Sequence, residues 1–430
     1  MKQARNRVDR KKGPVINKVT SLNIPQVSRE ILANGTELLE VNMGTQNLIQ
    51  LEILYKGGRI AEHKKGVSRA ASRLIKEGTT HLTSSQLAES VDFYGANLNS
   101  GASLDYSYIK IFTLNKHFDR ILPILQEVMD QPTFPEAELN KYKVNSIQKL
   151  QVEKAKSELV AYRTITESLY GSDHPYGYNS TEDMYNQLNR DDLLDYYNSN
   201  FGTDNRIIIL SGRITDEVRE KVKKAFGQTQ KPTLIKGYDQ PEVTPMRETK
   251  RLKAEDDFQS AVKIGCRLFK RSHEDFADMF ILNTVLGGYF GSRLMSKLRE
   301  EKGYTYNIYS SVDMMIHDGY FNISTEVGNE YLMPTLEGIY EEMEILKNEL
   351  ISSDELNMVR NYLSGNFLNM IDGPFKVAGM AKVIALNGLD FDFYRNLMRR
   401  IHLVTEHDLI ALARKYFNRD QMVEIIVGNP

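Results

Sequence analysis

The chain has 430 residues, of which 41% are hydrophobic and 26% are charged, a composition typical of a soluble globular protein. This length exceeds one ordinary hydrophobic core and predicts two domains of about 200 residues each. Its 55 Lys and Arg residues nearly balance its 57 Asp and Glu residues, and the net charge of -2 argues against a general attraction to nucleic acid or to an anionic membrane.

The chain begins with a basic segment, MKQARNRVDRKKGP, that no apolar run follows. It lacks the hydrophobic region of a secretory signal, so we expect residues 1–23 to be a frayed basic tail. No later stretch reaches the roughly 18 to 20 apolar residues of a membrane span. The single cysteine, Cys266, excludes an intrachain disulfide and favours the cytoplasm.

Strand-like and helix-like patterns are intermixed in the first half of the chain. In chain order we predict a half-buried strand and turn at 48–58, helices at 67–77 and 84–93, two strands within 98–114, and helices at 118–129 and from 136 onward. The turns are too short for regular parallel crossovers. Each domain is therefore predicted to be α+β, with a mainly antiparallel sheet packed with helices.

Residues 228–247 are predicted to be a linker because residues 227–247 contain three prolines, two glycines and little periodicity. The same order of elements then recurs. We predict strands at 259–268, 304–312 and 320–327, and helices at 274–286, 292–301, 332–348 and from 354 onward. The glycine-rich stretch at 287–293, GGYFGSR, lacks the glycine spacing of a phosphate-binding loop and is predicted to be a helix-to-helix turn.

The second half also repeats the first at the level of single residues. Residues 192–212 align with residues 408–428 without a gap and share, among other identities, an Asp, a Leu, a Phe, an Ile and a Gly. A second alignment places Gly95 on Gly303, each after a helix-like segment. We therefore predict two tandem homologous domains, residues 24–227 and 248–430, that face each other.

The residues alone do not indicate an enzyme. The eight histidines are scattered, and the closest two, His402 and His407, stand five positions apart and point to different helix faces. No nucleophile elbow, Walker loop or dinucleotide fingerprint is present. Cys266 lies in an apolar strand-like run, where we expect a buried thiol rather than a nucleophile.

Several motifs are nevertheless specific when taken together. These are LANGTELLEV, GGRIAEHKKG, HPYG at 174–177, and S-R-L-x-x-x-L-R-E-x-x-G-x-x-Y at 292–306. On these motifs the chain resembles the pitrilysin/insulinase family of zinc peptidases, the inverzincins, from about residue 24 onward. The resemblance implies two tandem domains like those of insulinase and mitochondrial processing peptidase.

The chain departs from this family at its zinc motif. Zinc-binding members read G-L-A-H-x-x-E-H-x-L-x-x-G-T, whereas residues 66–79 here read GVSRAASRLIKEGT. The resemblance places Arg69 and Arg73 at the two histidine positions, Ser72 at the general-base glutamate and Lys149 at the third ligand. Three cations repel a divalent metal, so we expect no zinc here and no catalytic role for these residues. As an alternative, Arg69, Arg73 and Lys149 are ordinary solvated charges on a helix face.

The second half has the Arg and the Tyr that the family's second domain contributes to the active site. The resemblance implies that Arg299 and Tyr306, seven positions apart, reach the reacting carbonyl and stabilise its negative charge. If Leu294 and Leu298 pack inward, Arg299 lies at the border of the buried helix face. From patterning alone, however, Arg299 is one more helix charge and Tyr306 one of 23 tyrosines.

Some bacterial members of the family divide their machinery between two subunits. The resemblance implies that this chain is the subunit without zinc and pairs with a homologous zinc-bearing partner in a heterodimeric endopeptidase for short, unfolded peptides. We expect peptide capture by strand addition at residues 99–103 or 259–265. A catalytically inert peptide-binding or assembly subunit and an independently active enzyme are the alternatives, and homodimerisation of the isolated chain is left open.

Overall fold

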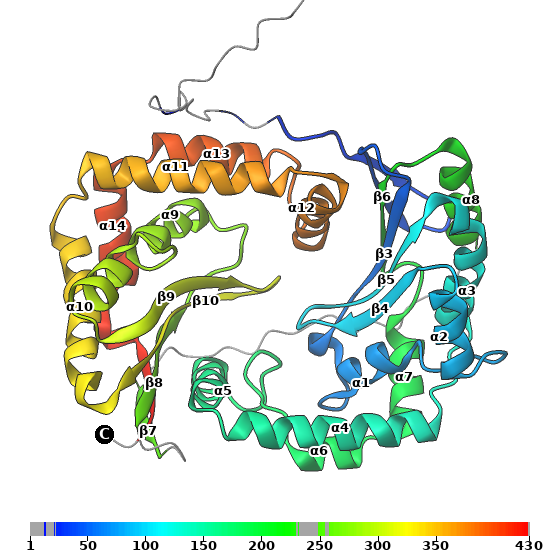
Figure 1. Cartoon of the computed structure of the whole chain (residues 1–430), viewed down its shortest axis with the longest axis horizontal. Coiled ribbons are helices and arrows are strands. Elements are labelled where there is room, and N and C mark those ends of the chain that lie inside the picture. Colours follow the sequence, from blue (N-terminus) through cyan, green and yellow to red (C-terminus); the bar gives the residue numbers. More distant parts are fainter. Residues whose placement is uncertain are drawn as a thin grey trace, which may run out of the picture.

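The computed structural model describes residues 13, 21, 23–228, 231, 248–253 and 258–428. These residues form two sheets packed with helices, in two halves that face each other in Figure 1. The predicted α+β class is confirmed. Nearly all of the predicted tail, residues 1–23, and of the predicted linker, residues 228–247, lies outside the described residues.

The first sheet has the strand order β1-β2-β6-β3-β5-β4, in which only the β2–β6 pair is parallel. Its strands are β1 (Ser28–Ile31), β2 (Glu37–Asn42), β3 (Leu48–Lys56), β4 (Asn97–Ala102), β5 (Tyr106–Leu114) and β6 (Arg206–Gly212). The helices of this half are α1 (Val67–Leu74), α2 (Ser84–Asp92), α3 (Phe118–Asp130), α4 (Glu136–Lys154), α5 (Ser157–Tyr170), α6 (Glu182–Gln187), α7 (Arg190–Asn200) and α8 (Asp216–Phe226).

The second sheet has the order β7-β11-β8-β10-β9 and again only one parallel pair, β7–β11. Its strands are β7 (Glu248–Leu252), β8 (Gln259–Arg267), β9 (Thr305–Met314), β10 (Gly319–Gly328) and β11 (Val423–Val427). The helices are α9 (Phe276–Leu286), η3 (Met295–Glu301), α10 (Leu332–Asn348), α11 (Ser353–Met370), α12 (Pro374–Asn387), α13 (Phe393–Leu403) and α14 (Glu406–Tyr416). No helix in the described ranges has the length and apolar content that crossing a bilayer demands.

Apart from the additional strand β1, the two sheets have the same strand order, because β2, β6, β3, β5 and β4 correspond in turn to β7, β11, β8, β10 and β9. This correspondence confirms the repeat. Residues that the repeat aligns also have the same structural roles in the two halves. Asp192 and Asp408 each complete a capping box at the start of α7 and α14, and the buried rings of Phe201 and Phe417 follow the last turn of these helices. Each helix then leads into a buried strand beside the centre of its sheet, β6 or β11.

Each half also contributes one helix to the sheet of the other half. Helix α5 packs on β8 and β11 of the second sheet, and α12 packs on β2 and β6 of the first. Strand β6 is consequently buried on both faces: Ile208 and Leu210 belong to the core of the first half, and Ile207 and Ile209 pack with α12.

The exchanged helices also carry partners for buried charges. Glu52 on β3 faces Ile209 on β6, and Lys263 on β8 faces Ile425 on β11. Because the repeat aligns Ile209 with Ile425, Glu52 and Lys263 occupy equivalent positions in the two sheets. The Glu52 carboxylate lies 3.0 Å from Nζ of Lys382 on α12, and Nζ of Lys263 lies 3.8 Å from the carboxylate of Glu158 on α5. The repeat therefore relates the two ion pairs with their charges reversed: the strand carries the carboxylate in the first pair and the ammonium in the second.

The hairpins β4–β5 and β9–β10 meet between the halves. Asp105, in the β4–β5 turn, accepts a hydrogen bond from the Tyr176 hydroxyl and another, 2.9 Å long, from the backbone N–H of Ile316 in the β9–β10 turn. Because Asp105 is buried, these bonds satisfy a carboxylate that would otherwise destabilise the junction.

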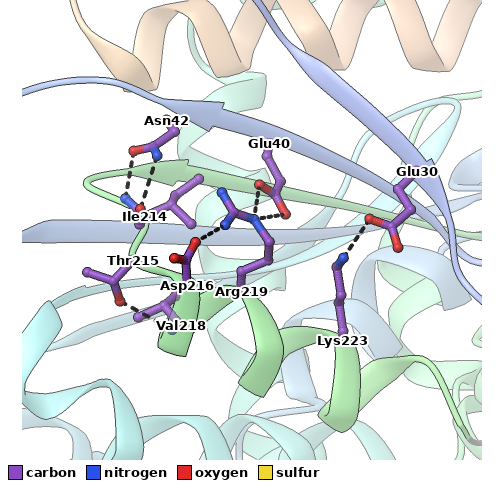
Figure 2. A network of polar contacts seen from close by, with 9 residues as sticks. All are labelled: Glu30, Glu40, Asn42, Ile214, Thr215, Asp216, Val218, Arg219 and Lys223. Carbon is purple, nitrogen blue, oxygen red and sulfur yellow. Dashed lines mark hydrogen bonds and ion pairs between the residues drawn. The ribbon is translucent and has the colours of Figure 1, made fainter.

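Helix α8 is attached to the first strands of the chain by polar contacts (Figure 2). The Arg219 guanidinium donates to the buried carboxylate of Glu40 on β2, with Nε 2.8 Å from Oε2. The Asn42 side chain exchanges two hydrogen bonds with the backbone of Ile214. These contacts fix α8 against the β2 side of the first sheet.

Candidate functional site

A pocket of about 410 Å³ lies beside β9 in the second half, and both Arg299 and Tyr306 line it. Its other walls come from β8, from β10 and from Glu158 on the exchanged helix α5. The predicted pair of side chains is therefore brought together at one site, and residues of both halves build that site.

Arg299 is placed by a helix with an unusual winding. Within the predicted helix at 292–301, residues Met295–Glu301 form a π-helix, with the Lys302 N–H donating to the Lys297 carbonyl at 3.1 Å. Leu294 and Leu298 are fully buried and Arg299 is half-buried, as their spacing predicts. The Arg299 guanidinium carbon lies 4.8 Å from the centre of the Phe290 ring, within range of a cation–π contact.

Tyr306 follows η3 after a glycine turn. Gly303 has a φ of +67° and ends the helix, just as Gly95, with a φ of +60°, ends α2 in the first half. Strand β9 then begins at Thr305, and the Tyr306 side chain is 93% exposed. An aromatic side chain that stays this exposed at a pocket wall is available for contact with another molecule.

The four positions that the resemblance aligns with the zinc motif offer no metal ligand. Arg69 and Arg73 lie one turn apart on the exposed side of α1, and Lys149 is exposed on α4 and 3.6 Å from Glu153. Ser72 instead points into the core, where its hydroxyl lies 2.9 Å from that of Ser107. These residues do not fit a divalent cation. Within the described ranges, no group of three or more His, Cys, Asp or Glu side chains could hold a metal.

Two family-like motifs of the first half meet at the start of α1. The Glu62 carboxylate accepts backbone N–H bonds from Gly66 and Ser68, both at 3.0 Å, and a bond from the Tyr178 hydroxyl. Glu62 belongs to the GGRIAEHKKG segment, and Tyr178 directly follows HPYG. They stabilise the N-terminus of α1, the helix that carries Arg69, Ser72 and Arg73.

Two further predictions from the sequence are confirmed. Cys266 is buried on β8, and burial raises the pKa of its thiol to about 12, which makes it a poor nucleophile. The stretch at 287–293 joins α9 to η3. Its Arg293 forms a two-pronged ion pair with Glu355 at 2.7 and 2.9 Å, so its basic side chain is engaged within the protein.

The HPYG motif contributes a titratable group to the junction of the halves. His174 is buried, and its Nδ1 accepts the Tyr176 N–H at 3.0 Å. Burial, and then the nearby Arg267 cation, lower the pKa of His174 from 6.5 to about 4. The unfolded chain therefore binds a proton between these values that the folded chain does not. The stability contributed by neutral His174 is complete above pH 6.5 and is lost as the pH falls toward 4.

Replacing His174 by asparagine should reduce this acid sensitivity, because an amide oxygen can accept the Tyr176 N–H without titrating. Between about pH 7 and about pH 4.5, we expect the parent chain to lose about 1 to 3 kcal/mol more unfolding free energy than His174→Asn. Urea unfolding at a series of pH values measures this difference. Parallel pH curves for the two proteins would contradict the assignment.

Two models of one peptidase family match the chain. The model described as insulinase (peptidase family M16) matches residues 43–175, and the model described as peptidase M16 inactive domain matches residues 187–363. The chain belongs to the insulinase (M16) family. Within this M16 fold, most of the pocket lining comes from the second half, and residues 66–79, which the resemblance aligns with the zinc motif, lie in the first half.

Relatives of this M16 chain span almost its whole length. A Bacillus subtilis (strain 168) protein named "Uncharacterized zinc protease YmxG" is 25% identical over 405 residues, which cover 93% of this chain and 98% of that protein. A Helicobacter pylori (strain ATCC 700392 / 26695) protein named "Non-peptidase homolog YmxG" is 22% identical over 399 residues and 88% of each chain.

Solved structures resemble the fold equally well. A peptidase M16 inactive domain from Pseudomonas fluorescens has a TM-score of 0.85 at 23% identity, covering 95% of this chain and 99% of that one. A protease from Helicobacter pylori also has a TM-score of 0.85, at 19% identity, and covers 94% of this chain and 100% of its own. These structures support the two-half M16 architecture.

Proposed function

We propose that this chain is the non-zinc subunit of a heterodimeric M16 endopeptidase and that it supplies Arg299 and Tyr306 in trans to a zinc-bearing homologous partner. The observation that carries the proposal is that both side chains line one pocket, in a chain that has Arg or Lys at the positions of the family's zinc ligands. We place zinc on the partner and none on this chain, and the single cysteine favours the cytoplasm as the location.

The proposed chemistry of this chain is electrophilic. The partner's zinc would supply an activated water. As negative charge builds on the peptide carbonyl oxygen, the Tyr306 hydroxyl donates a hydrogen bond to it, and the Arg299 guanidinium donates to the same oxygen or to the adjacent peptide backbone. The cation–π contact with Phe290 orients the guanidinium without neutralising its charge.

Strand addition at β4 is the proposed mode of peptide capture. Strand β4 is at one end of the first sheet, and its sequence, NLNSGA, contains no charge and no proline that would discourage pairing. The other predicted strand, at 259–265, is wrong as a docking edge, because β8 lies between β11 and β10 and is paired on both sides. Strand β9 is also an end strand, but its Ser310 N–H already donates to the Gly287 carbonyl at 3.0 Å.

Mixing the purified chain with a zinc-bearing M16 partner and assaying a quenched peptide tests the proposal. We expect cleavage from the mixture, loss of cleavage when the partner's zinc is chelated, and none from this chain alone. Cleavage by this chain alone would refute the trans arrangement in favour of an independent enzyme. Sedimentation of the isolated chain reveals any homodimer that forms without the partner.

An inert peptide-binding or assembly subunit is the second candidate. It is favoured by the inactive-domain description of the matching model and by the non-peptidase name of the Helicobacter pylori relative. This function predicts that a mixture with the partner cleaves peptide equally well with or without the Tyr306 hydroxyl. The Tyr306→Phe variant therefore separates the two candidates.

A further inference from the structure

The strand that carries Tyr306 is irregular at Tyr306 itself. Along β9 and β10, register partners run in step from Met314 to Ile308, which faces Thr325. The next partners are Thr305 and Val327, so Tyr306 and Asn307 together face the single residue Glu326. Two residues opposite one define a β-bulge, a feature that re-aims side chains beside active sites.

The bulge changes the direction of the Tyr306 side chain. In a regular strand, successive side chains point to opposite faces, and β9 follows this rule from Ile308, which is buried, to Tyr309, which is exposed. Tyr306 and Asn307 are consecutive, yet both are exposed. The extra residue therefore lets Tyr306 extend from the sheet edge into the pocket region.

Two threonine hydroxyls replace the ladder bonds that the bulge interrupts. The Thr305 Oγ1 lies 2.7 Å from the Glu326 carbonyl and accepts the Asn307 N–H at 3.2 Å. The Thr325 Oγ1 lies 2.9 Å from the Asn307 carbonyl and 2.9 Å from the Thr305 Oγ1. Side-chain hydroxyls of this kind commonly pair the backbone groups that a bulge leaves without ladder partners.

We propose that Thr325 and Thr305 are positioning residues that hold the bulge and thereby direct the Tyr306 hydroxyl toward the reacting carbonyl. This role rests on the proposed function of Tyr306. Thr325 is the more informative of the two, because it is 4% exposed on β10 and, although it also lines the pocket, its hydroxyl lies 2.9 Å from two atoms of the bulge. Valine has nearly the same shape but no hydroxyl, whereas serine keeps the hydroxyl.

The activity test uses the chain mixed with its zinc-bearing partner. We expect Thr325→Val to lower kcat by about 10- to 100-fold with little change in KM, and Thr325→Ser to keep most of the activity. In the Tyr306→Phe background, Thr325→Val should have no further effect on kcat, because the hydroxyl that it positions is already gone. An equal loss in both backgrounds would overturn the proposal.

A second measurement needs only this chain. Hydrogen exchange of the segment 304–310 should be faster in Thr325→Val than in the parent and unchanged in Thr325→Ser. Thr284→Val, which removes a buried hydroxyl from α9, serves as the matched control and should leave this segment unaffected. Unchanged exchange in Thr325→Val would refute the positioning role. Faster exchange together with an inactive parent mixture would support the bulge while rejecting the proposed function.

Discussion

Replacing Tyr306 by phenylalanine is expected to lower the kcat of the mixed peptidase by about 100- to 1,000-fold, the usual effect of losing one oxyanion donor. The ring remains, so contacts of the 93% exposed side chain with peptide or partner are largely kept. We therefore expect KM and complex formation to change little. Steady-state kinetics with a quenched peptide and titration of the two subunits measure these quantities separately.

The matched control is Tyr331→Phe. Tyr331 is 39% exposed and stacks on Tyr304, with ring centres 5.1 Å apart, but its side chain does not line the pocket. This variant should retain full activity. Full activity in Tyr306→Phe as well would assign the chain to the inert class, and loss of complex formation in Tyr306→Phe would mean that the phenol serves assembly rather than chemistry.

Replacing Lys382 by methionine is expected to lower the free energy of unfolding by about 3 to 5 kcal/mol, the usual cost of leaving a buried charge unpaired. The Glu52 side chain is only 4% exposed, and Lys382 comes from the opposite half. Burial lowers the pKa of Lys382, but the Glu52 carboxylate and its neighbours raise it more, so the ammonium stays charged. Denaturant unfolding at neutral pH measures the loss.

A double-mutant cycle with Glu52→Gln isolates the pair. The double variant should be more stable than the sum of the single effects predicts, because no charge is left without a partner. Glu158→Gln, at the sign-reversed pair, should cost less, since Glu158 is 47% exposed and lies 3.8 Å from Lys263. A negligible loss in Lys382→Met would mean that water reaches Glu52 and that the contact between the halves is loose.

The repeated plan of the fold is predictable from sequence because it depends on local chemistry. Asp192 and Asp408 recur because each completes a helix cap, and Gly95 and Gly303 recur because each ends a helix at positive φ. The exchange of helices is not predictable in this way. The run IIIL in β6 indicates burial on both faces, but no local pattern specifies that α12, far along the chain, covers one of them.

The candidate site likewise has features that local sequence predicts and features that it does not. Burial of Leu294 and Leu298 follows from helical spacing and places Arg299 at the pocket. The β-bulge at Tyr306 and the contribution of Glu158 from the first half depend on pairing between distant segments. The same limitation explains the error at β8: alternation identifies a strand, whereas only the strand order reveals whether that strand has a free edge.

The exchange of helices has a consequence for synthesis on the ribosome. The strands of the first sheet are complete once Gly212 has been added, but their second cover, α12, follows only with Pro374–Asn387. At about 5 to 20 residues per second, the nascent chain waits roughly 10 to 35 seconds with Leu39, Val41 and Ile209 uncovered. During this interval the emerging polypeptide is a natural client for chaperones, and slower translation lengthens its exposure to aggregation.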